Sequence, residues 1–225
     1  YFKEYVEYNL YTTSSLTLGD TLGSKINTVK MMYKSLIPYE TPEQIIKISD
    51  YNRIAKLYGN KEYTLNENEY MIIADYDNMA QIRNIALKNN EKITVFDHEL
   101  VPKFDECQYG FVEISSSHIN SGIIVVPDDI VEEDNIAYNS IIGNYYTDDL
   151  DEQKGIQEQI KNLVKNPISA EYCLPTINSK SDISEASIGI GALVTFLGLY
   201  LGIVFLIASV AILALKELTE STDNK

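Results

Sequence analysis

The sequence has no tryptophan, and its 225 residues include only two histidines and two cysteines. Cys107 and Cys173 lie far apart and no Cys-x-x-Cys pair occurs, which argues against a structural zinc site. Outside the cell the two thiols can form one disulfide. The alternative is that both stay free and partly buried, and the sequence leaves that choice open.

Basic residues are scarce. The chain has 18 Lys and Arg against 33 Asp and Glu, for a formal net charge of −15. Residues 1–185 hold 16 of the basic and 30 of the acidic residues, so this part carries −14. Such a surface argues against nucleic acid, whose phosphates need basic contacts. Two interpretations of the negative charge remain. Its long-range field attracts cationic ligands, or the charge serves only to keep the domain soluble.

Catalytic motifs are missing as well. Residues 22–25 (LGSK) lack the Gly-Lys-Ser/Thr triplet of a phosphate-binding loop, and there is no Gly-x-Ser-x-Gly elbow. Residues 115–118 (SSSH) fit a hairpin turn better than a nucleophile with its base. Residues 97–99 (DHE) have no second cluster of metal ligands. The sequence therefore predicts a chain that is not an enzyme and holds no cofactor or metal.

The strongest positive feature is an apolar run over 186–215, with no charge between Glu185 and Lys216. It exceeds the roughly 20 apolar residues that a helix needs to cross a bilayer. Its place at the C-terminal end is not that of a secretion signal. The run predicts one transmembrane helix behind a large polar domain.

Small residues recur on one face of this predicted helix. Gly198 and Gly202 form a Gly-x-x-x-Gly pair, and Gly191 falls on nearly the same face. The pattern favours packing against another helix, in a multi-span protein or a dimer, although glycine is common in membrane helices generally. Lys216 and Lys225 favour a cytoplasmic tail and hence an extracellular polar domain.

Strand-like and helix-like segments alternate in the polar part, which predicts an α+β (mixed α/β) domain. Strand patterns occupy 70–74, 92–96, 110–114, 122–126, 136–146 and 172–177. Helical patterns occupy 24–36, 49–58, 78–87 and 149–164. Residues 41–48 begin either a helix at Thr41-Pro42-Glu43 or a short strand at 45–48.

The sequence suggests four parts: a poorly assigned stretch over 1–40, an α/β extracellular domain over 41–185, the span over 186–215, and a cytoplasmic tail over 216–225. The chain begins without a methionine and stops soon after the span. We therefore expect it to be a fragment of a longer protein of the cell membrane.

One acidic cluster stands out, formed by Asp128, Asp129, Glu132, Glu133 and Asp134. Its first members suit the N-terminus of a short helix, whose dipole favours anions. The other interpretation is a patch that attracts a cationic ligand.

Several of these segments together resemble the FtsX-like (MacB-type) ABC transporter permeases, and within them the BceB-like branch. The resemblance is carried by the C-terminal span with its tail, ALVTFLGLYLGIVFLIASVAILALKELTESTDNK (192–225). Upstream it is carried by ISDYNRIAKLYG (48–59), TLNENEYMII (64–73) and IIVVPDDIV (123–131).

The resemblance implies a polytopic permease that pairs with a separate cytoplasmic ATPase, often with a sensor histidine kinase. It implies resistance to cell-envelope-active peptide antibiotics, with the outer domain engaging the peptide or its lipid-linked target. The alternative is an FtsX-type scaffold that relays the state of the ATPase to a cell-wall hydrolase or a kinase, without transport. No ligand-binding motif of the family maps onto individual residues here.

Overall fold

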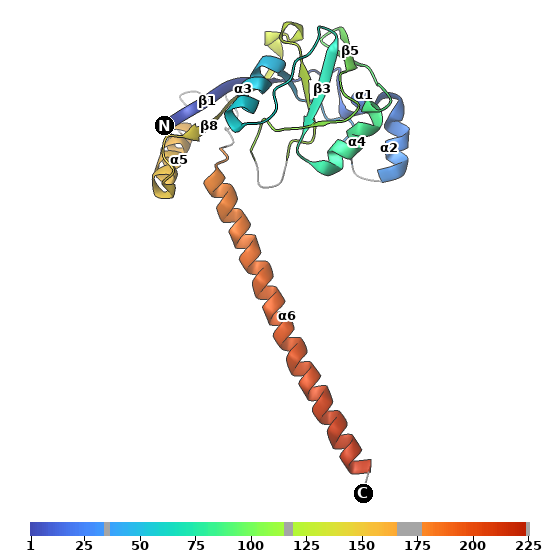
Figure 1. Ribbon diagram of the computed structural model, residues 1–225, viewed down its shortest axis with the longest axis vertical. Helices are drawn as coiled ribbons and strands as arrows, with labels where there is room; N and C mark the ends of the chain where they lie inside the picture. Colours follow the sequence, from blue (N-terminus) through green and yellow to red (C-terminus); the bar gives the residue numbers. More distant parts are fainter. Residues whose placement is uncertain (34–36, 115–118, 166–176, 224–225) are drawn as a thin grey trace. The chain divides into compact units, whose positions relative to one another are not determined.

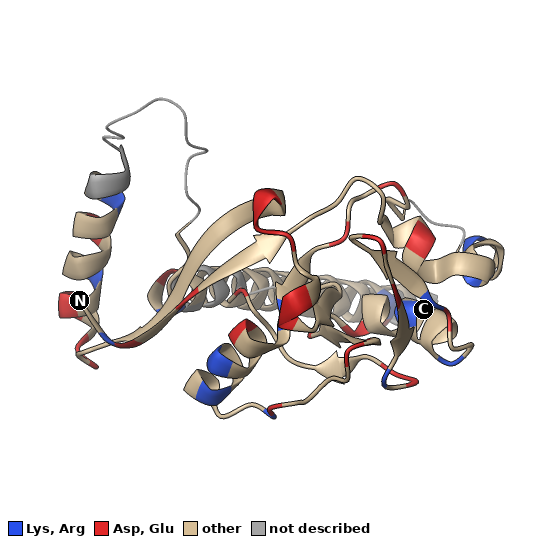
Figure 2. Cartoon of the chain, turned by 90° about the horizontal axis from the view of Figure 1, so that it is seen from above, with Lys and Arg blue, Asp and Glu red and all other residues tan. Residues whose placement is uncertain are grey.

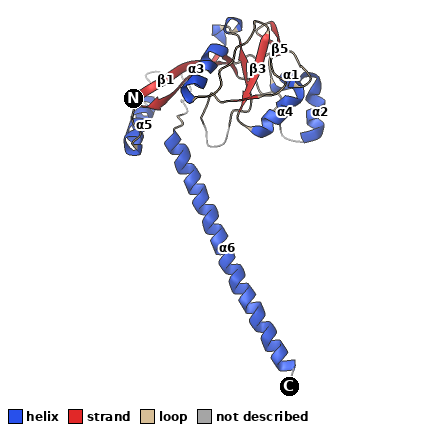
Figure 3. Ribbon diagram, viewed as in Figure 1, coloured by secondary structure: helices blue, strands red, loops and turns tan. Residues whose placement is uncertain are grey.

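The computed structural model describes residues 1–33, 37–114, 119–165 and 177–223. Two compact units divide the chain, Tyr1–Ile177 and Asn178–Lys225. The first is a mixed α/β unit and the second is one long helix (Figures 1 and 3). The predicted fold class, a mixed α/β domain followed by one long apolar helix, is therefore confirmed.

An eight-stranded sheet is the frame of the first unit, counted over the described residues. Its order is β4-β5-β3-β7-β2-β1-β8, and β6 pairs with β3 off this path. β2 and β7 are parallel neighbours, whereas β1 pairs antiparallel with both β2 and β8. The strands are β1 (Phe2–Tyr11), β2 (Ile45–Lys47), β3 (Glu69–Ala74), β4 (Ile93–Val95), β5 (His98–Pro102), β6 (Gln108–Tyr109), β7 (Ile123–Val126) and β8 (Ile136–Tyr145).

The helices of this unit are α1 (Leu18–Leu22), α2 (Ile26–Tyr33), α3 (Ile48–Tyr58), α4 (Asp77–Leu87) and α5 (Leu150–Lys165), with short 3-10 turns at Gly23–Lys25, Asp128–Ile130 and Glu133–Asn135. In the sequence α1 to α4 lie between strands, and α5 follows β8. α3 ends where the sequence predicts, because Gly59 takes the left-handed conformation at φ 70° and its N–H bonds back into the last turn. Thr17 is the N-cap of α1, and its side chain and that of Asp20 form a reciprocal capping box.

Most predicted elements appear within a few residues of their expected bounds. For residues 41–48, the structure confirms the short strand, which is β2, and not the helix. The strand expected over 110–114 is wrong. There the N–H groups of Val112 and Glu113 donate to the Asn120 side chain, so a side-chain amide replaces the ladder of a sheet. The turn at 115–118 and most of the strand expected over 172–177 lie outside the described residues.

The two central strands are buried on both faces. In β7, Ile123 and Val125 join the apolar cluster under α3, while Ile124 and Val126 join the cluster on the opposite face. β3 divides its side chains in the same way. This explains why both strands are continuous apolar runs in the sequence and do not alternate with polar residues.

Buried tyrosines explain part of the abundance of this residue type. Tyr8 donates its hydroxyl hydrogen to the Val112 carbonyl at 2.6 Å, and Tyr70 donates to the Glu91 carbonyl at 2.9 Å. Each ring fills the core while its hydroxyl finds an acceptor at the edge. Burial raises the pKa of Tyr8 to about 12, so its phenol is neutral at ordinary pH.

The second unit is α6 (Lys180–Asp223), which contains an apolar stretch over Gly191–Thr219. Twenty-nine helical residues rise about 43 Å, more than the thickness of a bilayer's hydrocarbon core. By length and composition this helix is able to cross a membrane. Its described side chains from Gly191 to Thr219 are exposed, as the lipid-facing surface of a span requires.

Candidate functional site

The acidic cluster predicted from the sequence lies at the carboxyl ends of β2 and β7. Because these strands are parallel and in register, with Lys47 opposite Val126, the start of α3 meets the turn after β7. Asp128 in that turn accepts a hydrogen bond from the backbone N–H of Ser49 at 3.1 Å. Lys47 occupies the N-cap position of α3 but makes no cap with its own side chain. Asp128 therefore supplies the cap from another strand.

Glu133 is also engaged within the domain. Its carboxylate forms an ion pair with Lys47 and accepts the hydroxyl of Tyr11 at 3.3 Å. The Lys47 ammonium in turn lies 5.5 Å from the centre of the Tyr11 ring. The hydrogen bond from Lys47 lowers the pKa of Glu133, and the same bond raises the pKa of Lys47.

All five members of the cluster are exposed, and what sets Asp128 and Glu133 apart is their contact with α3 and β2. The other three are Asp129, Glu132 and Asp134, and Glu132 accepts a hydrogen bond from the Asn135 side-chain amide at 2.9 Å. Figure 2 shows that acidic segments are spread over the first unit. The structure thus brings all five residues together, but Asp128 and Glu133 have structural partners. The part free to attract a cation is centred on Asp129 and Asp134.

Asp128 and its neighbour Asp129 form a matched pair for testing this division. Asp128→Ala is expected to reduce the free energy of unfolding by about 1 kcal/mol, because it removes the cap of α3. Asp129→Ala removes the same charge but no cap, and should change stability by less than about 0.5 kcal/mol. Thermal unfolding of both variants of the full chain in neutral detergent provides the comparison. Equal losses in the two variants would contradict the capping role.

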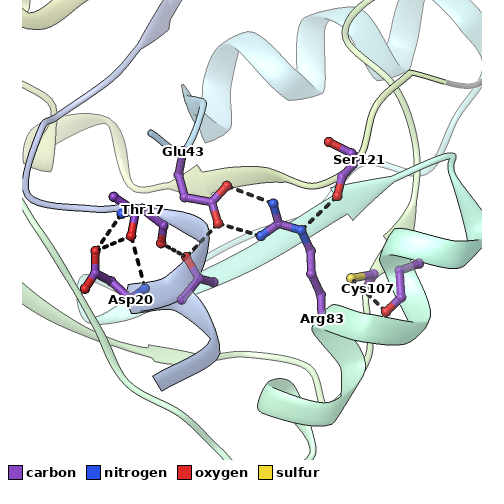
Figure 4. A network of polar contacts seen from close by, with 8 residues as sticks. Thr17, Asp20, Glu43, Arg83, Cys107 and Ser121 are labelled. Atoms are coloured by element: carbon purple, nitrogen blue, oxygen red, sulfur yellow. Dashed lines mark hydrogen bonds and ion pairs between the residues drawn. The ribbon is translucent and has the colours of Figure 1, made fainter. Parts of the chain in front are cut away.

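A second polar cluster, which the sequence analysis missed, is buried in the first unit (Figure 4). Arg83 of α4 and Glu43, just before β2, form a two-pronged ion pair with N–O distances of 2.7 and 2.8 Å. The exposed fractions of the two side chains are only 3% and 4%. Burial opposes the charge on Arg83, but the Glu43 carboxylate outweighs it and keeps the pKa of Arg83 above its ordinary value.

Neighbouring segments complete this cluster. Thr21 of α1 donates its hydroxyl to Glu43 at 2.7 Å, and the Nε of Arg83 donates to the Ser121 carbonyl at 2.8 Å. Four segments distant in sequence are therefore joined at one point. Gly122 belongs to the same cluster because a Cβ atom there would lie 1.9 Å from the Nε of Arg83. These four segments satisfy one another's polar groups, so the cluster is a structural centre of the first unit.

Cys107 lies close to this ion pair. Its backbone N–H donates to the Asn84 side chain at 2.7 Å, and its sulfur lies 3.9 Å from the Ala80 carbonyl. Burial raises the pKa of Cys107 to about 11, so the thiol is neutral and unreactive at ordinary pH. Cys173 lies outside the described residues, and the predicted choice between a disulfide and two free thiols stays open.

The three glycines predicted to pack against another helix share one face of α6. At 100° per residue, Gly191, Gly198 and Gly202 fall within about 40° of one another. A Cβ atom at any of the three would meet nothing within 4 Å. Thr195 and Ser209 lie on the same side and donate their hydroxyls to carbonyls one turn earlier, both at 2.8 Å. The face therefore carries small side chains, and its hydroxyls are hydrogen-bonded within the helix. Both properties suit close packing against another helix in lipid.

Two further segments, 97–99 and 22–25, were considered in the sequence analysis as a metal site and a phosphate-binding loop. Among the described residues there is no group of three or more side chains able to hold a metal ion, and this includes 97–99. In the 22–25 segment, the Ser24 hydroxyl donates a hydrogen bond to the Glu91 carboxylate. This bond connects the segment to the loop after α4.

Comparisons with known proteins found no matching family model, no matching curated protein and no matching solved structure.

Proposed function

We propose that this chain is the outer domain and adjoining span of a permease subunit of the FtsX-like, BceB-like type of ABC transporter. In this proposal the domain lies outside the cell membrane and engages cationic, cell-envelope-active peptides or their lipid-linked targets. It acts as a binding partner without catalysing a reaction. A cytoplasmic ABC ATPase supplies the energy, and a sensor histidine kinase is a further partner.

The observation that carries the proposal is the direct joining of an acidic α/β unit to a long apolar helix. Residues 1–185 carry a net charge of −14, and the helix that begins at Lys180 contains 29 residues suited to a bilayer. A domain with this charge at a membrane surface raises the local concentration of cationic peptides. The small-residue face of α6 supports the proposal, because a permease subunit needs helices that pack closely against one another.

Peptide binding tests the proposal directly. The full chain is placed in nanodiscs of neutral lipid, so that the membrane itself does not attract the peptide. A panel of cationic envelope-active peptides is then titrated at low and at moderate salt. We expect saturable binding of at least one peptide, weakened about tenfold at moderate salt because screening shortens the reach of the domain's field.

Two controls make the result specific. An analogue of the bound peptide with its lysines replaced by glutamine should bind much more weakly, because it keeps the length but loses the charge. Empty nanodiscs report binding to lipid alone. Failure of every peptide to bind above the empty discs would contradict peptide binding by this domain, and would favour a lipid-linked target or the scaffold without transport.

A further inference from the structure

The outer edge of β8 is the feature that the proposed function does not yet use. β8 stands at one end of the sheet order, and among the described residues its only sheet neighbour is β1. The two strands pair over nearly their full length, from Phe2 opposite Tyr145 to Tyr11 opposite Ile136. In such a pair every second residue of the edge strand directs its N–H and C=O away from its neighbour. Within the part of the chain that the structure describes, the outer edge of β8 over 136–144 is therefore a template for another strand.

This edge lacks the usual protection against strand addition. Proteins blunt exposed edges with charged side chains, proline or very short strands. The sequence from Asn135 to Thr147 contains no charged residue and no proline. Tyr138 is 54% exposed and Ile141 is 60% exposed. A long, uncharged and partly apolar edge of this kind is suited to pairing with an extended segment.

Apolar side chains are available on both faces of the edge. Tyr138 pairs with Leu10 and so points to the face that α3 covers, whereas Ile141 pairs with Glu7 on the opposite face. Gly143 lies opposite Tyr5, whose Cβ would be 2.8 Å from a Cβ at this glycine. An added strand therefore meets a tyrosine on one face and an isoleucine on the other, as alternating side chains require.

Acidic residues flank this uncharged strand at both ends. Three precede it, Glu132, Glu133 and Asp134, and four follow it, Asp148, Asp149, Asp151 and Glu152. Asp149 caps α5 by accepting the N–H groups of Asp151 and Glu152 at 2.9 and 3.0 Å. The neighbouring β1 adds Lys3, Glu4 and Glu7 near the edge.

This charge pattern selects the occupant of the edge. In a second copy of the chain, antiparallel pairing of β8 with β8 would place the acidic group at one end against the acidic group at the other. Parallel pairing would also place like charges together, which costs free energy. A peptide with an apolar centre and basic residues at both ends meets opposite charge at each end.

We propose that the β8 edge binds an extended cationic peptide by strand addition, with its basic ends held by the two acidic flanks. The inference rests on the proposed function, since it names where and how the acidic domain takes its peptide. Backbone hydrogen bonds provide most of the contact, and the flanks select for basic ends.

A backbone probe tests this inference on the full chain in neutral-lipid nanodiscs. The probe is the synthetic peptide Lys-Lys-Thr-Val-Tyr-Val-Thr-Lys-Lys, with two derivatives that carry N-methyl groups on alternate residues of its centre. In strand addition only one alternate set of N–H groups faces β8. We expect one derivative to bind at least about tenfold more weakly and the other to bind nearly as well as the parent. Equal binding of both derivatives would overturn the inference.

Matched substitutions in the protein provide the second arm. Ile141→Lys places a charge on the edge strand and should weaken binding at least about tenfold. Met31→Lys makes the same change of charge on α2, at a side chain that is 78% exposed, and should weaken binding less than about twofold. Equal effects of the two variants would overturn the inference and leave the proposed function standing. If neither this probe nor any envelope-active peptide binds the unaltered chain, peptide binding in the proposed function fails too.

Discussion

Replacing Arg83 with methionine is expected to lower the free energy of unfolding by about 3–5 kcal/mol. The change leaves the Glu43 carboxylate buried, with Thr21 as its only remaining hydrogen-bond donor from this cluster. It also removes the hydrogen bond that the Nε–H of Arg83 donates to the Ser121 carbonyl. At about 2–4 °C per kcal/mol, the midpoint of thermal unfolding should fall by roughly 6–20 °C. The measurement is thermal unfolding of the full chain in neutral detergent, followed by the near-ultraviolet circular dichroism of its tyrosines.

The double variant Glu43→Leu with Arg83→Met separates a lost charge partner from lost packing. If the loss arises from an uncompensated buried carboxylate, removing that carboxylate should recover part of the stability. Full recovery is not expected, because the Ser121 carbonyl still loses the Nε–H of Arg83, whereas the Thr21 hydroxyl keeps the Thr17 carbonyl as an acceptor. A double variant that is less stable than Arg83→Met alone would contradict this explanation.

Gly122→Ala is the second substitution expected to have a large effect, a loss of about 3 kcal/mol. Gly122 has φ 129°, which residues with a side chain rarely adopt, and its added Cβ would meet the Nε of Arg83 at 1.9 Å. Arg83 cannot easily move aside, because Glu43 holds both of its terminal nitrogens. Thermal unfolding in neutral detergent measures the loss.

Gly59→Ala is the matched control for this prediction. Gly59 also has a positive φ, 70°, but a Cβ atom there meets nothing within 4 Å. It should therefore lose only about 1 kcal/mol, from backbone strain alone. The cost of Gly122→Ala should also be smaller in the Arg83→Met background, because the two sites are in contact. Identical losses at Gly59 and Gly122 would contradict the role of the collision with Arg83.

Local patterns were enough to predict several elements. Gly59 ends α3 as expected, because a left-handed position after a helix is a local requirement that glycine meets. The apolar runs over 70–74 and 122–126 predict strands, and the structure confirms them as β3 and β7. Burial of both faces explains why no polar residue interrupts either run. The expected strand over 110–114 failed, because the Asn120 side chain takes the backbone N–H groups that a neighbouring strand would otherwise receive.

The candidate sites depended more heavily on contacts between distant segments. Asp128 was predicted to belong to a helix N-terminus, and it does cap one, but the helix is α3, which begins 80 residues earlier in the sequence, at Ile48. The parallel pairing of β2 with β7 brings the two together, and no local pattern reports that pairing. Glu43 and Arg83 likewise appear in the sequence as ordinary charged residues of separate segments.

The sequence by itself determined the apolar helix, the acidic balance and the mixed α/β class, because hydropathy, charge and periodicity are properties of composition and short range. Only the tertiary structure decided which acidic residues of the cluster contact other elements of the fold. It also decided that Arg83 and Glu43 are buried together and that β8 ends the sheet. These outcomes arise because a carboxylate or a strand edge takes its role from the groups that folding brings beside it.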